Sequence, residues 1–545
     1  MMRQIKSELK DRINQVLNSL SFPQRDYTLT PPKNIEYGDL STNIALVLAQ
    51  DLKTSPMDIA KDLVNEIVKY DIKNIINISI HKPGFINFEI SKIYFQSQVT
   101  KIIKLSIKYG QGSIGAGKSA NIEFVSANPT GPLTIGHGRN AILGDVVSNI
   151  LKWQGYDVTR EYYFNDAGRQ MRILAKSVQA LYFKLLGEDI QIPEDGYQGE
   201  YLNDIAKIIV NEDGGNLEKD SNIFKEKTEK IIFHQIEQSL KNLGVEFDQF
   251  INEKTFYENG DIKNLLENLR KKDLIYEKDN ATWFKTSALG KKQDRVYIKS
   301  TGEPTYRVPD TAYHINKVKR NYDLIIDVFG ADHADTYQDV ILALQSLNYK
   351  TEHIKVLIYQ FVTLLQNGKK IKMSTRKANF VTLDELVNEV GSDVVRYFFL
   401  MRSMNTHLDF DLNLAKDQSD KNPVFYLQYA YARICNIIKR ANDLKLSEEN
   451  NYDTSILDHE DEILLIKYLS RFPEFIDHAY ENLEPQIITN YLQQLSAYFH
   501  KFYSQCRVIS DDHDTTQARI ALVKAAKIIL GNGFNILGIS APERM

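Results

Sequence analysis

Residues 134–138, which read Thr-Ile-Gly-His-Gly, have the types and spacing of a phosphate-binding helix start. They follow the apolar segment NIEFVSA (121–127) and a Pro/Gly turn, and an apolar pattern of helical period comes after them. The first turn of a helix attracts phosphate through free backbone N–H groups and the helix dipole. His137 can donate a hydrogen bond to phosphate there, and Gly136 and Gly138 let a ligand approach the backbone. For an isolated histidine, a capping or packing role would be the commoner explanation.

A second group with chemical potential is the cationic segment 369–377, which reads KKIKMSTRK. A loop of cations over a triphosphate would stabilise the charge that develops during transfer at an α-phosphate. A solvated charged loop is the alternative for such a run. The sequence leaves open which of its cations would act.

Acidic and hydrogen-bonding side chains occur in two further segments. Glu123, Ser126 and Asn128 stand at the end of the first apolar segment, and Tyr306 and Asp310 lie four residues apart in PTYRVPDTAYH. Two carboxylates near one another suit a planar guanidinium, which they can hold through paired hydrogen bonds. The alternatives are a strand-edge ion pair for Glu123 and core packing for Tyr306.

No resident metal is expected. Asp332 and His333 are adjacent, but no third ligand has the spacing of a metal site. The two cysteines, Cys435 and Cys506, form no CxxC pair and are expected to be buried thiols in a reducing cytosol. No Ser/His/Asp triad is visible either.

The phosphate-binding and acidic groups need a parallel sheet to bring them together, and residues 113–415 have that pattern. Strands at 121–127 and 157–164 flank a helix at 136–153, which predicts a right-handed βαβ unit and a Rossmann-type α/β domain. The strand pattern resumes at 295–300, 323–330 and 354–361. A mostly helical insertion at about 170–290 therefore splits the predicted sheet.

Residues 1–112 are predicted to form a small separate α/β domain. Helical stretches at 5–20 and 41–51 precede alternating strand patterns in 76–90. The Gly/Ser-rich segment 111–119 is expected to be a linker. Residues 112–119 formally match a phosphate loop, but no buried strand precedes them and no helix follows, as that loop requires.

Residues 416–545 are predicted to form an all-α bundle. A capping box, Thr382 with Glu385, opens a part of the chain that is expected to be helical throughout from about 383. One predicted helix, 485–503, carries an apolar stripe of Ile488, Leu492, Leu495, Phe499 and Phe502. The last predicted helix spans 516–530 and is expected to end at the Gly-Asn-Gly of 531–533.

Composition places the chain among globular proteins with several domains. Its 545 residues are 43% hydrophobic and 25% charged, and the net charge of −4 does not exclude RNA, because a local basic face is enough. No run approaches the ~18 apolar residues of a membrane span, and the N-terminus lacks an apolar signal core. A cytoplasmic protein that does not bind membranes is expected.

The segments ANPTGPLTIGHGR (127–139) and KMSTR (372–376) resemble the two ATP-binding signatures of class I aminoacyl-tRNA synthetases. The flanking residues narrow the resemblance to the arginyl-tRNA synthetases. NIEYGDLSTNIA and KPGFINF resemble the N-terminal domain of that family, which touches the tRNA elbow. NPVFYLQYAYARI and ILGISAPERM resemble its anticodon-binding bundle, so the likeness spans residues 1–545. This chain departs from the family at Thr134, where a histidine is usual, and at Thr375, where a lysine is usual.

The resemblance implies roles for individual residues. Those implied to act in catalysis are His137, Lys372, Ser374 and Arg376. Those implied to bind ATP are Pro129, Thr134, Gly136, His137, Gly138, Asp332, His333, Lys372, Met373 and Ser374. Those implied to bind arginine are Glu123, Ser126, Asn128, Tyr306 and Asp310. On the RNA side, Phe425, Tyr426, Tyr429 and Tyr431 could stack on unpaired bases, although helical spacing favours burial for most of them.

The implied reaction has two steps and needs no protein nucleophile. The carboxylate of L-arginine attacks the α-phosphate of ATP, which gives arginyl-adenylate and pyrophosphate, and the 3′ end of tRNA(Arg) then takes the arginyl group. Positioning and charge stabilisation would carry the rate. Magnesium would arrive with ATP, and the chain is expected to be a monomer.

Two alternatives remain open from the sequence. One is another class I synthetase, although a cysteinyl enzyme should show zinc-ligand cysteines and a glutamyl enzyme should place arginine against its substrate. The other is an RNA-binding scaffold without catalysis, which only the departures at Thr134 and Thr375 support.

Overall fold

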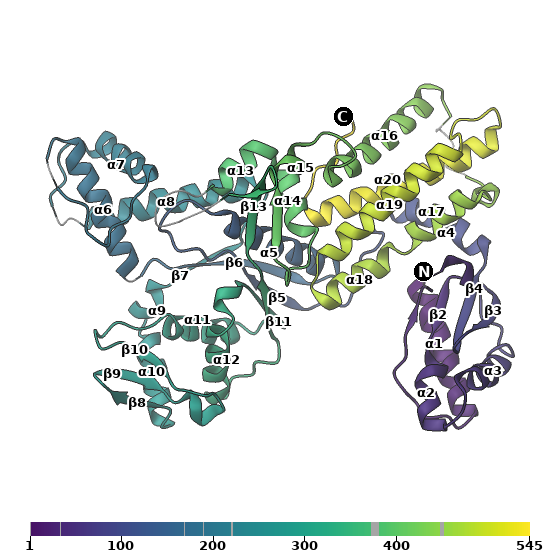
Figure 1. Cartoon of the computed structure of the whole chain (residues 1–545), viewed down its shortest axis with the longest axis horizontal. Coiled ribbons are helices and arrows are strands. Elements are labelled where there is room, and N and C mark those ends of the chain that lie inside the picture. The colour runs from purple at the N-terminus through teal and green to yellow at the C-terminus, as the bar shows by residue number, and fades with distance from the viewer. Residues whose placement is uncertain are drawn as a thin grey trace.

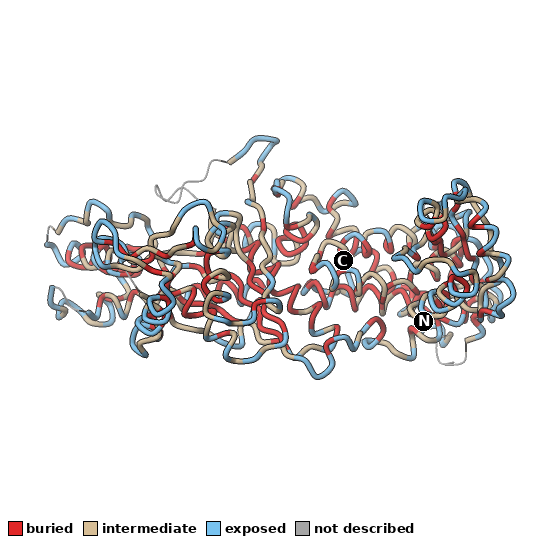
Figure 2. Tube along the Cα trace, turned by 90° about the horizontal axis from the view of Figure 1, so that it is seen from below, coloured by how far each residue is buried: buried red, intermediate tan, exposed pale blue. Residues whose placement is uncertain are grey.

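The computed structural model describes residues 2–32, 34–167, 169–188, 190–219, 222–371, 381–446 and 452–545. The molecule is elongated, with a central α/β region that lies between a helical bundle and two inserted segments of the chain (Figure 1). The small N-terminal domain lies against one end of the bundle. Buried residues run through the length of the molecule and continue into the bundle (Figure 2).

The central sheet is parallel and has five strands in the order β12-β11-β5-β6-β7. Its strands are β5 (Ser119–Glu123), β6 (Asp157–Phe164), β7 (Gln249–Asn252), β11 (Leu324–Gly330) and β12 (Ile354–Tyr359). β6, the next strand along the chain, pairs with one side of β5, and β11, which comes much later, pairs with the other side. The strand order therefore reverses at the β5–β11 pair, where α/β sheets bind ligands. The predicted βαβ unit is confirmed, with α5 (Ile135–Trp153) as its helix.

Several strands differ from the prediction. The segment predicted at 295–300 forms β10 (Arg295–Ile298), which joins β8 (Ile275–Lys278) and β9 (Ala281–Phe284) in a separate antiparallel sheet. Its alternating, half-exposed pattern suits an antiparallel strand better than the centre of a parallel sheet. In contrast, β7 was not predicted, because this four-residue edge strand has polar ends and little burial.

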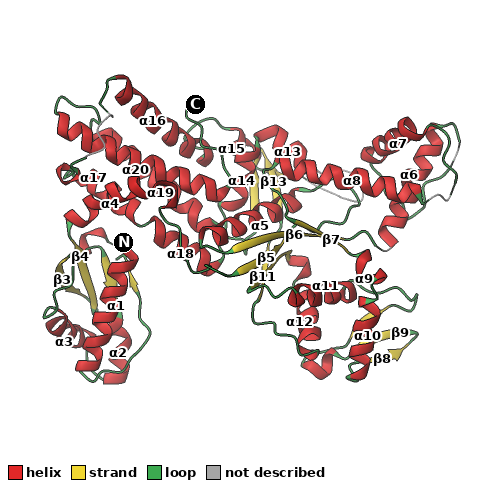
Figure 3. Ribbon diagram, turned by 180° about the vertical axis from the view of Figure 1, so that it is seen from behind, coloured by secondary structure: helices red, strands yellow, loops and turns green. Residues whose placement is uncertain are grey.

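The predicted single insertion is therefore two inserted segments, because the chain returns to the central sheet at β7 between them (Figure 3). The first is helical, with α6 (Arg169–Leu185), α7 (Glu200–Asp213) and α8 (Ile223–Asn242). The second holds α9 (Lys254–Glu258), α10 (Asp261–Lys271), the small sheet and α11 (Arg307–Lys319), and α12 (Thr336–Ser346) packs on α11. This second part has a core of its own that includes Tyr163, Tyr297 and Tyr313.

The N-terminal part is a four-stranded antiparallel sheet in the order β1-β2-β4-β3, packed against helices. Its elements are α1 (Met2–Ser19), β1 (Leu29–Thr30), β2 (Leu40–Thr42), α2 (Ile44–Leu52), α3 (Pro56–Ile67), β3 (Ile75–His81) and β4 (Phe85–Ile90). The next helix, α4 (Lys92–Leu105), packs instead on α17 and α20 of the C-terminal bundle. The domain boundary at 112 stays a prediction.

The Gly/Ser-rich segment 111–119 is a turn that leads into β5, and no helix follows it. The backbone N–H of Gly112 donates to Trp153 O (3.0 Å), and that of Gly115 donates to Gln154 O (2.9 Å). A Cβ atom at Gly112 would lie 1.6 Å from the Gln154 side chain. These glycines serve close packing against the end of α5 rather than phosphate binding.

Most of the chain after residue 381 is helical, beginning with α13 (Leu383–Val390) and α14 (Ser392–Leu400). Thr382 and Glu385 form the predicted capping box of α13. The bundle consists of α16 (Pro423–Asp443), α17 (Glu460–Ser470), α18 (Phe472–Asn482), α19 (Gln486–Gln505) and α20 (His513–Leu537). One strand interrupts the helices, because β15 (Leu408–Asp411) pairs with β13 (Val362–Gln366), which also pairs with β14 (Lys369–Lys370). α15 (Leu412–Lys416) follows β15 directly.

The apolar stripe of α19 is buried as predicted, but the last helix does not end at 531–533. It continues through both glycines and ends at Gly538, a C-cap with φ +66°. A Cβ atom at Gly533 would lie 2.5 Å from Leu492 Cδ2, so this glycine allows α19 and α20 to approach closely. Close helix contact, not termination, explains the glycine pair.

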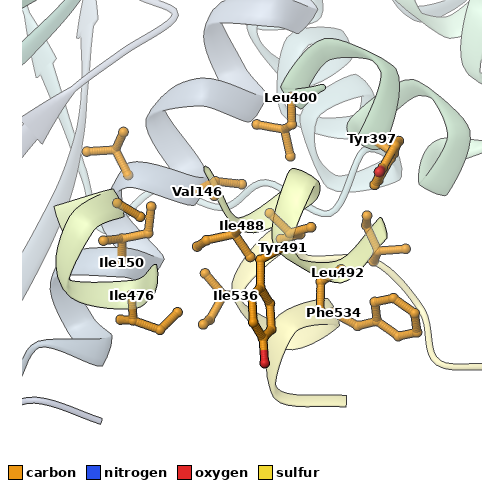
Figure 4. Close-up of a cluster of buried hydrophobic side chains, with 14 of the residues drawn as sticks. Val146, Ile150, Tyr397, Leu400, Ile476, Ile488, Tyr491, Leu492, Phe534 and Ile536 are labelled. Carbon is orange, nitrogen blue, oxygen red and sulfur yellow. The ribbon is translucent and has the colours of Figure 1, made fainter. Parts of the chain in front are cut away.

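The bundle and the α/β region share one core. Figure 4 shows Val146 and Ile150 of α5 facing side chains of α14, α18, α19 and α20. Cys435 and Cys506 are buried free thiols, as predicted. Among the described helices, α20 alone is long and apolar enough to cross a membrane, but 72% of its apolar window is buried inside the protein, as in the central helix of a bundle.

Candidate active site

The carboxyl ends of β5 and β11 place several predicted site residues together. Asp327 of β11 is paired in register with Glu123, the last residue of β5. The chain then turns sharply through Val125 (φ +65°) and Ser126 (φ +40°), both in the left-handed region. Asn140 of α5 holds this turn, because its Oδ1 accepts from Val125 N–H (2.8 Å) and its Nδ2 donates to Val328 O (3.0 Å). The strained backbone is thus fixed from both sides.

Thr134 and His137 cap the start of α5. His137 N–H donates to Thr134 Oγ1 (3.5 Å), and the Nδ1 atom of His137 accepts from Thr134 N–H (3.1 Å). An Nδ1 atom that accepts carries no proton, so the proton of the neutral ring sits on Nε2. Burial lowers the pKa of His137 to about 4. The side chain is therefore a neutral donor at neutral pH, and among the described residues no hydrogen bond reaches its Nε2–H group.

The two glycines beside His137 have different surroundings. A Cβ atom at Gly136 would meet only Thr134 Oγ1, at 3.7 Å, so this side of the helix start is open. A Cβ atom at Gly138 would lie 2.5 Å from Leu383 Cδ1, so the absence of a side chain there serves packing against α13. Pro129 is buried within the turn.

A cavity of about 840 Å³ lies over the start of α5. Asn128, Thr134 and His137 line it on one side, and the connection between α6 and α7 lines it on the other, through Tyr197 and Tyr201 among others. The hydroxyl of Tyr201 donates to Thr130 O (2.7 Å), which ties that connection to the signature turn. The cavity is large enough for a nucleotide.

A second cavity, of about 1080 Å³, adjoins the first and shares Gln170 and Asp195 with it. Tyr306, 56% exposed, lines it at the N-cap of α11. Asp310 follows one turn later and is partly accessible. Among the described residues, no hydrogen bond or ion pair reaches the Asp310 carboxylate. Burial raises the pKa of Asp310 to about 6, and repulsion from Glu123 adds to the rise.

Asp332 and His333 form the short turn η4 (Ala331–His333) after β11. Both are well exposed, and His333 Nε2 lies 3.7 Å from Asp332 Oδ2. Asp332 is close enough to His137 to oppose the fall in the pKa of that histidine. The two residues are thus at the same edge of the sheet as the start of α5.

Glu123, His314 and Asp327 lie close enough together to suggest a metal site. The ammonium of Lys317 already fills this place, because it contacts Glu123 Oε2 and lies 2.5 Å from Asp327 Oδ1. All four side chains are buried. A cation that is part of the protein thus neutralises the acids, and the group has no room for a metal ion. Ser126 Oγ donates to the remaining Glu123 oxygen (2.8 Å) and accepts from Tyr163 N–H (3.1 Å).

The second predicted signature, with Lys372, Met373, Ser374 and Arg376, lies outside the described residues. Its flanks are described. Lys369 and Lys370 form β14 before it, and after it Thr382 bridges to Thr134. Leu383 N–H also donates to Leu133 O (2.9 Å). The chain after the second signature is therefore bonded to the turn that carries the first, whereas the chain before it belongs to the sheet of β13, β14 and β15.

Sequence reasoning missed His314, Lys317 and Tyr201. The first two had a usable signal, since Asp310, His314 and Lys317 are spaced to share one face of α11. An ionisable face on a helix that packs on a sheet must find partners there. Tyr201 had no signal, because only tertiary packing brings the α6–α7 connection to the signature turn.

The aromatic residues of α16 differ in how far they are buried. Tyr431 is buried, while Tyr429 is 39% exposed and stacks with Phe425 at a ring distance of 6.2 Å. The Arg433 guanidinium lies 4.5 Å from the Tyr429 ring centre. His500 of α19 stacks on the Tyr429 ring (6.2 Å), which extends the aromatic surface to a second helix.

Three family models match the chain. Residues 4–90 match the arginyl tRNA synthetase N terminal domain, residues 98–397 match the catalytic domain of tRNA synthetases class I (R), and residues 427–545 match the DALR anticodon binding domain. An arginine–tRNA ligase of Salinibacter ruber is 45% identical over 562 residues, which cover 99% of this chain and 100% of the relative. One of Desulfotalea psychrophila is 44% identical over 552 residues, with the same coverage. The solved arginyl-tRNA synthetase of Thermus thermophilus has a TM-score of 0.76 at 20% identity, over 98% of this chain and 99% of that one, which shows the fold alone.

Proposed function

Because this chain belongs to the arginyl-tRNA synthetases, the class I ligases that join arginine to tRNA, we propose a residue-level account of how it does so. The enzyme activates L-arginine with ATP to arginyl-adenylate, releases pyrophosphate and transfers arginine to the 3′ end of tRNA(Arg). The observation that best supports the account is that a hydrogen-bond donor suited to phosphate and an acid suited to a guanidinium come from elements that line neighbouring cavities. His137, a neutral donor at the start of α5, lines the first cavity, and the first turn of α11, which carries the partly buried Asp310 carboxylate, contributes Tyr306 and Pro309 to the adjoining cavity.

ATP binds over the start of α5. The Nε2–H of His137 donates to an α-phosphate oxygen and strengthens this bond as negative charge develops in the transition state. Gly136 leaves the backbone N–H groups accessible, and Thr134 fixes the ring of His137 instead of carrying charge. Pro129, Gly138, Asp332 and His333 complete the ATP site. Magnesium accompanies the triphosphate as part of the substrate, and the protein itself holds no structural metal.

The cationic segment provides the remaining charge stabilisation. Lys372, Met373 and Ser374 bind the nucleotide, and Lys372, Ser374 and Arg376 act in catalysis. This role rests on the resemblance to the family signature. In this chain Thr375 stands where the family usually has a lysine. Arg376, the next residue, is the cation that we assign to compensate for it.

Arginine binds at the carboxyl end of β5. Asp310 receives the guanidinium together with Tyr306, and Glu123 is the second acid, which contributes through its charge because both of its oxygens have partners within the protein; the substrate charge relieves the repulsion between the two acids. Ser126 and Asn128 hold the α-amino and carboxylate ends. This geometry directs the arginine carboxylate toward His137 and the α-phosphate. Proximity and charge stabilisation then suffice for the reaction without a protein nucleophile.

The remaining parts of the chain serve tRNA. Residues 1–112 contact the tRNA elbow, residues 113–415 catalyse, and residues 416–545 bind the anticodon, with Tyr429 and its stacked neighbours as a platform for unpaired bases. The protein acts as a monomer in the cytoplasm and does not bind membranes.

Aminoacylation of tRNA(Arg) with a panel of amino acids tests the function directly. Arginine alone should be charged, and ATP–pyrophosphate exchange should require arginine when tRNA is present. If the full chain binds tRNA(Arg) but supports neither reaction, the chain is an RNA-binding scaffold and the catalytic proposal fails. If it charges another amino acid more efficiently, the arginine site fails while the class I chemistry stands.

A further inference from the structure

One face of α11 carries three ionisable side chains at increasing depth, and they follow Tyr306 and Pro309, which line the second cavity. Asp310, His314 and Lys317 are spaced by four and three residues, which aligns them along the helix. Asp310 is partly accessible, whereas His314 is 5% exposed and Lys317 is fully buried. The middle member, His314, has no role in the reaction as described so far.

Both ring nitrogens of His314 face hydrogen-bond acceptors. Its Nδ1 lies 2.8 Å from the backbone carbonyl oxygen of Asp310, and its Nε2 lies 3.1 Å from Asp327 Oδ2. A carbonyl oxygen can only accept, and an ionised carboxylate can only accept. Both nitrogens must therefore donate, which makes the ring a buried imidazolium.

The partner carboxylate is ionised. Burial alone would raise the pKa of Asp327, but Lys317 and His314 outweigh it and hold that pKa well below its usual range. Burial alone would lower the pKa of His314, but Asp327 outweighs it, so the pKa of His314 lies above its usual value. The charged and titratable groups around His314 are Asp327 of β11, Glu123 of β5, and Asp310, Tyr313 and Lys317 of its own helix.

We propose that His314 is a positioning residue for arginine recognition: as a permanent imidazolium it fixes the first turn of α11 and keeps Asp310 ionised for a cationic substrate. The inference rests on the proposed function, in which Asp310 receives the guanidinium. Neither His314 nor Asp310 is among the residues that line the two cavities, and His314 acts through Asp310, which lies one turn after the cavity-lining Tyr306. Its hydrogen bond anchors the Asp310 backbone, and its charge opposes the repulsion that Glu123 exerts on the Asp310 carboxylate.

The first test needs no variant. Nitrogen NMR of the full-length protein, labelled in its 11 histidines, distinguishes an imidazolium from the neutral tautomers. One histidine should keep both nitrogens protonated at pH 8, where exposed histidines are neutral. A spectrum at pH 8 without an imidazolium overturns the proposal. This result is independent of whether Asp310 binds arginine, which Asp310→Asn tests separately.

The second test asks whether the charge matters for recognition. In His314→Gln, the acid limb of kcat/KM for arginine should move to higher pH, because Asp310 then ionises less readily. A shift of one pH unit lowers the ionised fraction, and so kcat/KM, by up to about tenfold on the acid side. The profile for ATP should keep its position, and His234→Gln, a change at an exposed histidine of α8, should match the wild type. A loss for arginine that is equal at every pH overturns the charge role. If His314→Gln does not fold, the NMR result decides.

Discussion

Glu123 and Asp327 lie directly opposite each other on adjacent parallel strands, and one ammonium group, that of Lys317, contacts both. The pair stands at the point where the strand order of the sheet reverses. Two ionised acids buried side by side would repel each other strongly, so the lysine is what allows both to occupy this position. The protein interior at the carboxyl ends of β5 and β11 is therefore a cluster of paired charges rather than an apolar core.

Replacing Lys317 by methionine should destabilise the fold severely. The change keeps most of the side-chain volume but removes the ammonium that contacts both carboxylates, and loss of one partner of a buried ion pair typically costs about 3–5 kcal/mol. Urea unfolding at pH 7.5 measures the loss. Lys319→Met, an exposed lysine two residues later on the same helix, is the matched control and should change the free energy of unfolding by less than about 0.5 kcal/mol. Equal effects of the two substitutions would contradict the role of Lys317.

Asp310→Asn should stabilise the protein while it abolishes arginine recognition. The folded pKa of Asp310, about 6, lies above its ordinary value of 3.8, so the folded state holds this proton more tightly than the unfolded state. The resulting penalty on stability grows as pH rises from about 4 and is complete above about 6, where it reaches up to roughly 2–3 kcal/mol. The asparagine variant avoids it.

Urea unfolding of both proteins at pH 4 and pH 8 checks this sign. The variant should be the more stable form at pH 8 and indistinguishable from the wild type at pH 4. Arginine KM should rise by at least about 100-fold, the size expected when a buried charge pair loses one partner. ATP binding should not change. A variant that is less stable at pH 8 would mean that the carboxylate has a protein partner.

The sequence predicted the parts of this molecule that depend on local pattern. The βαβ unit, the capping box at Thr382 and the buried stripe of α19 follow from periodicity and caps, which neighbouring residues alone determine. The errors concern features that distant residues decide. β10 has a strand pattern but joins another sheet, and the glycines of α20 serve contact with Leu492 rather than an end of the helix.

The same distinction holds for the site. Residues in continuous motifs, such as Thr134 and His137, could be found from the sequence because their spacing on one helix start carries the chemistry. The spacing on α11 signals that Lys317 needs a partner but does not identify it, because Glu123 and Asp327 come from two strands about 200 residues apart in sequence, and only the fold pairs them. Charge balance inside a site depends on tertiary structure.

His137→Ala should slow adenylate formation by about 100-fold or more, with less effect on arginine binding. The reason is that the Nε2–H group, the donor of the neutral ring, stabilises the negative charge that develops on the α-phosphate in the transition state. ATP–pyrophosphate exchange with tRNA present measures the rate. Because the pKa of His137 is about 4, the wild-type rate should not fall as pH rises through 6.5. A rise in the KM for ATP with unchanged kcat would show that His137 binds only the ground state.

The N-terminal part, for which we propose tRNA binding, should be removable at one position and not at another. Deleting residues 1–90 removes the antiparallel sheet and helices α1–α3 but keeps α4, whose Val99 and Ile102 are fully buried against the bundle side of the molecule. Deleting residues 1–112 removes α4 as well. We expect the shorter deletion to fold, to bind ATP with wild-type affinity and to bind tRNA(Arg) more weakly.

The longer deletion should lower the melting temperature, because it exposes the apolar surfaces of α17 and α20 that α4 covers. Calorimetry on both proteins, with ATP and then with tRNA(Arg), separates the two effects. The bonds that tie the N-terminal part to the bundle include the ion pair of Lys6 with Glu474 (3.0 Å) and that of Asp39 with Lys467 (2.6 Å), and both deletions remove these partly buried pairs equally. If a folded protein without residues 1–90 also loses ATP binding, the N-terminal part contributes to the active site and is not a tRNA-binding domain alone.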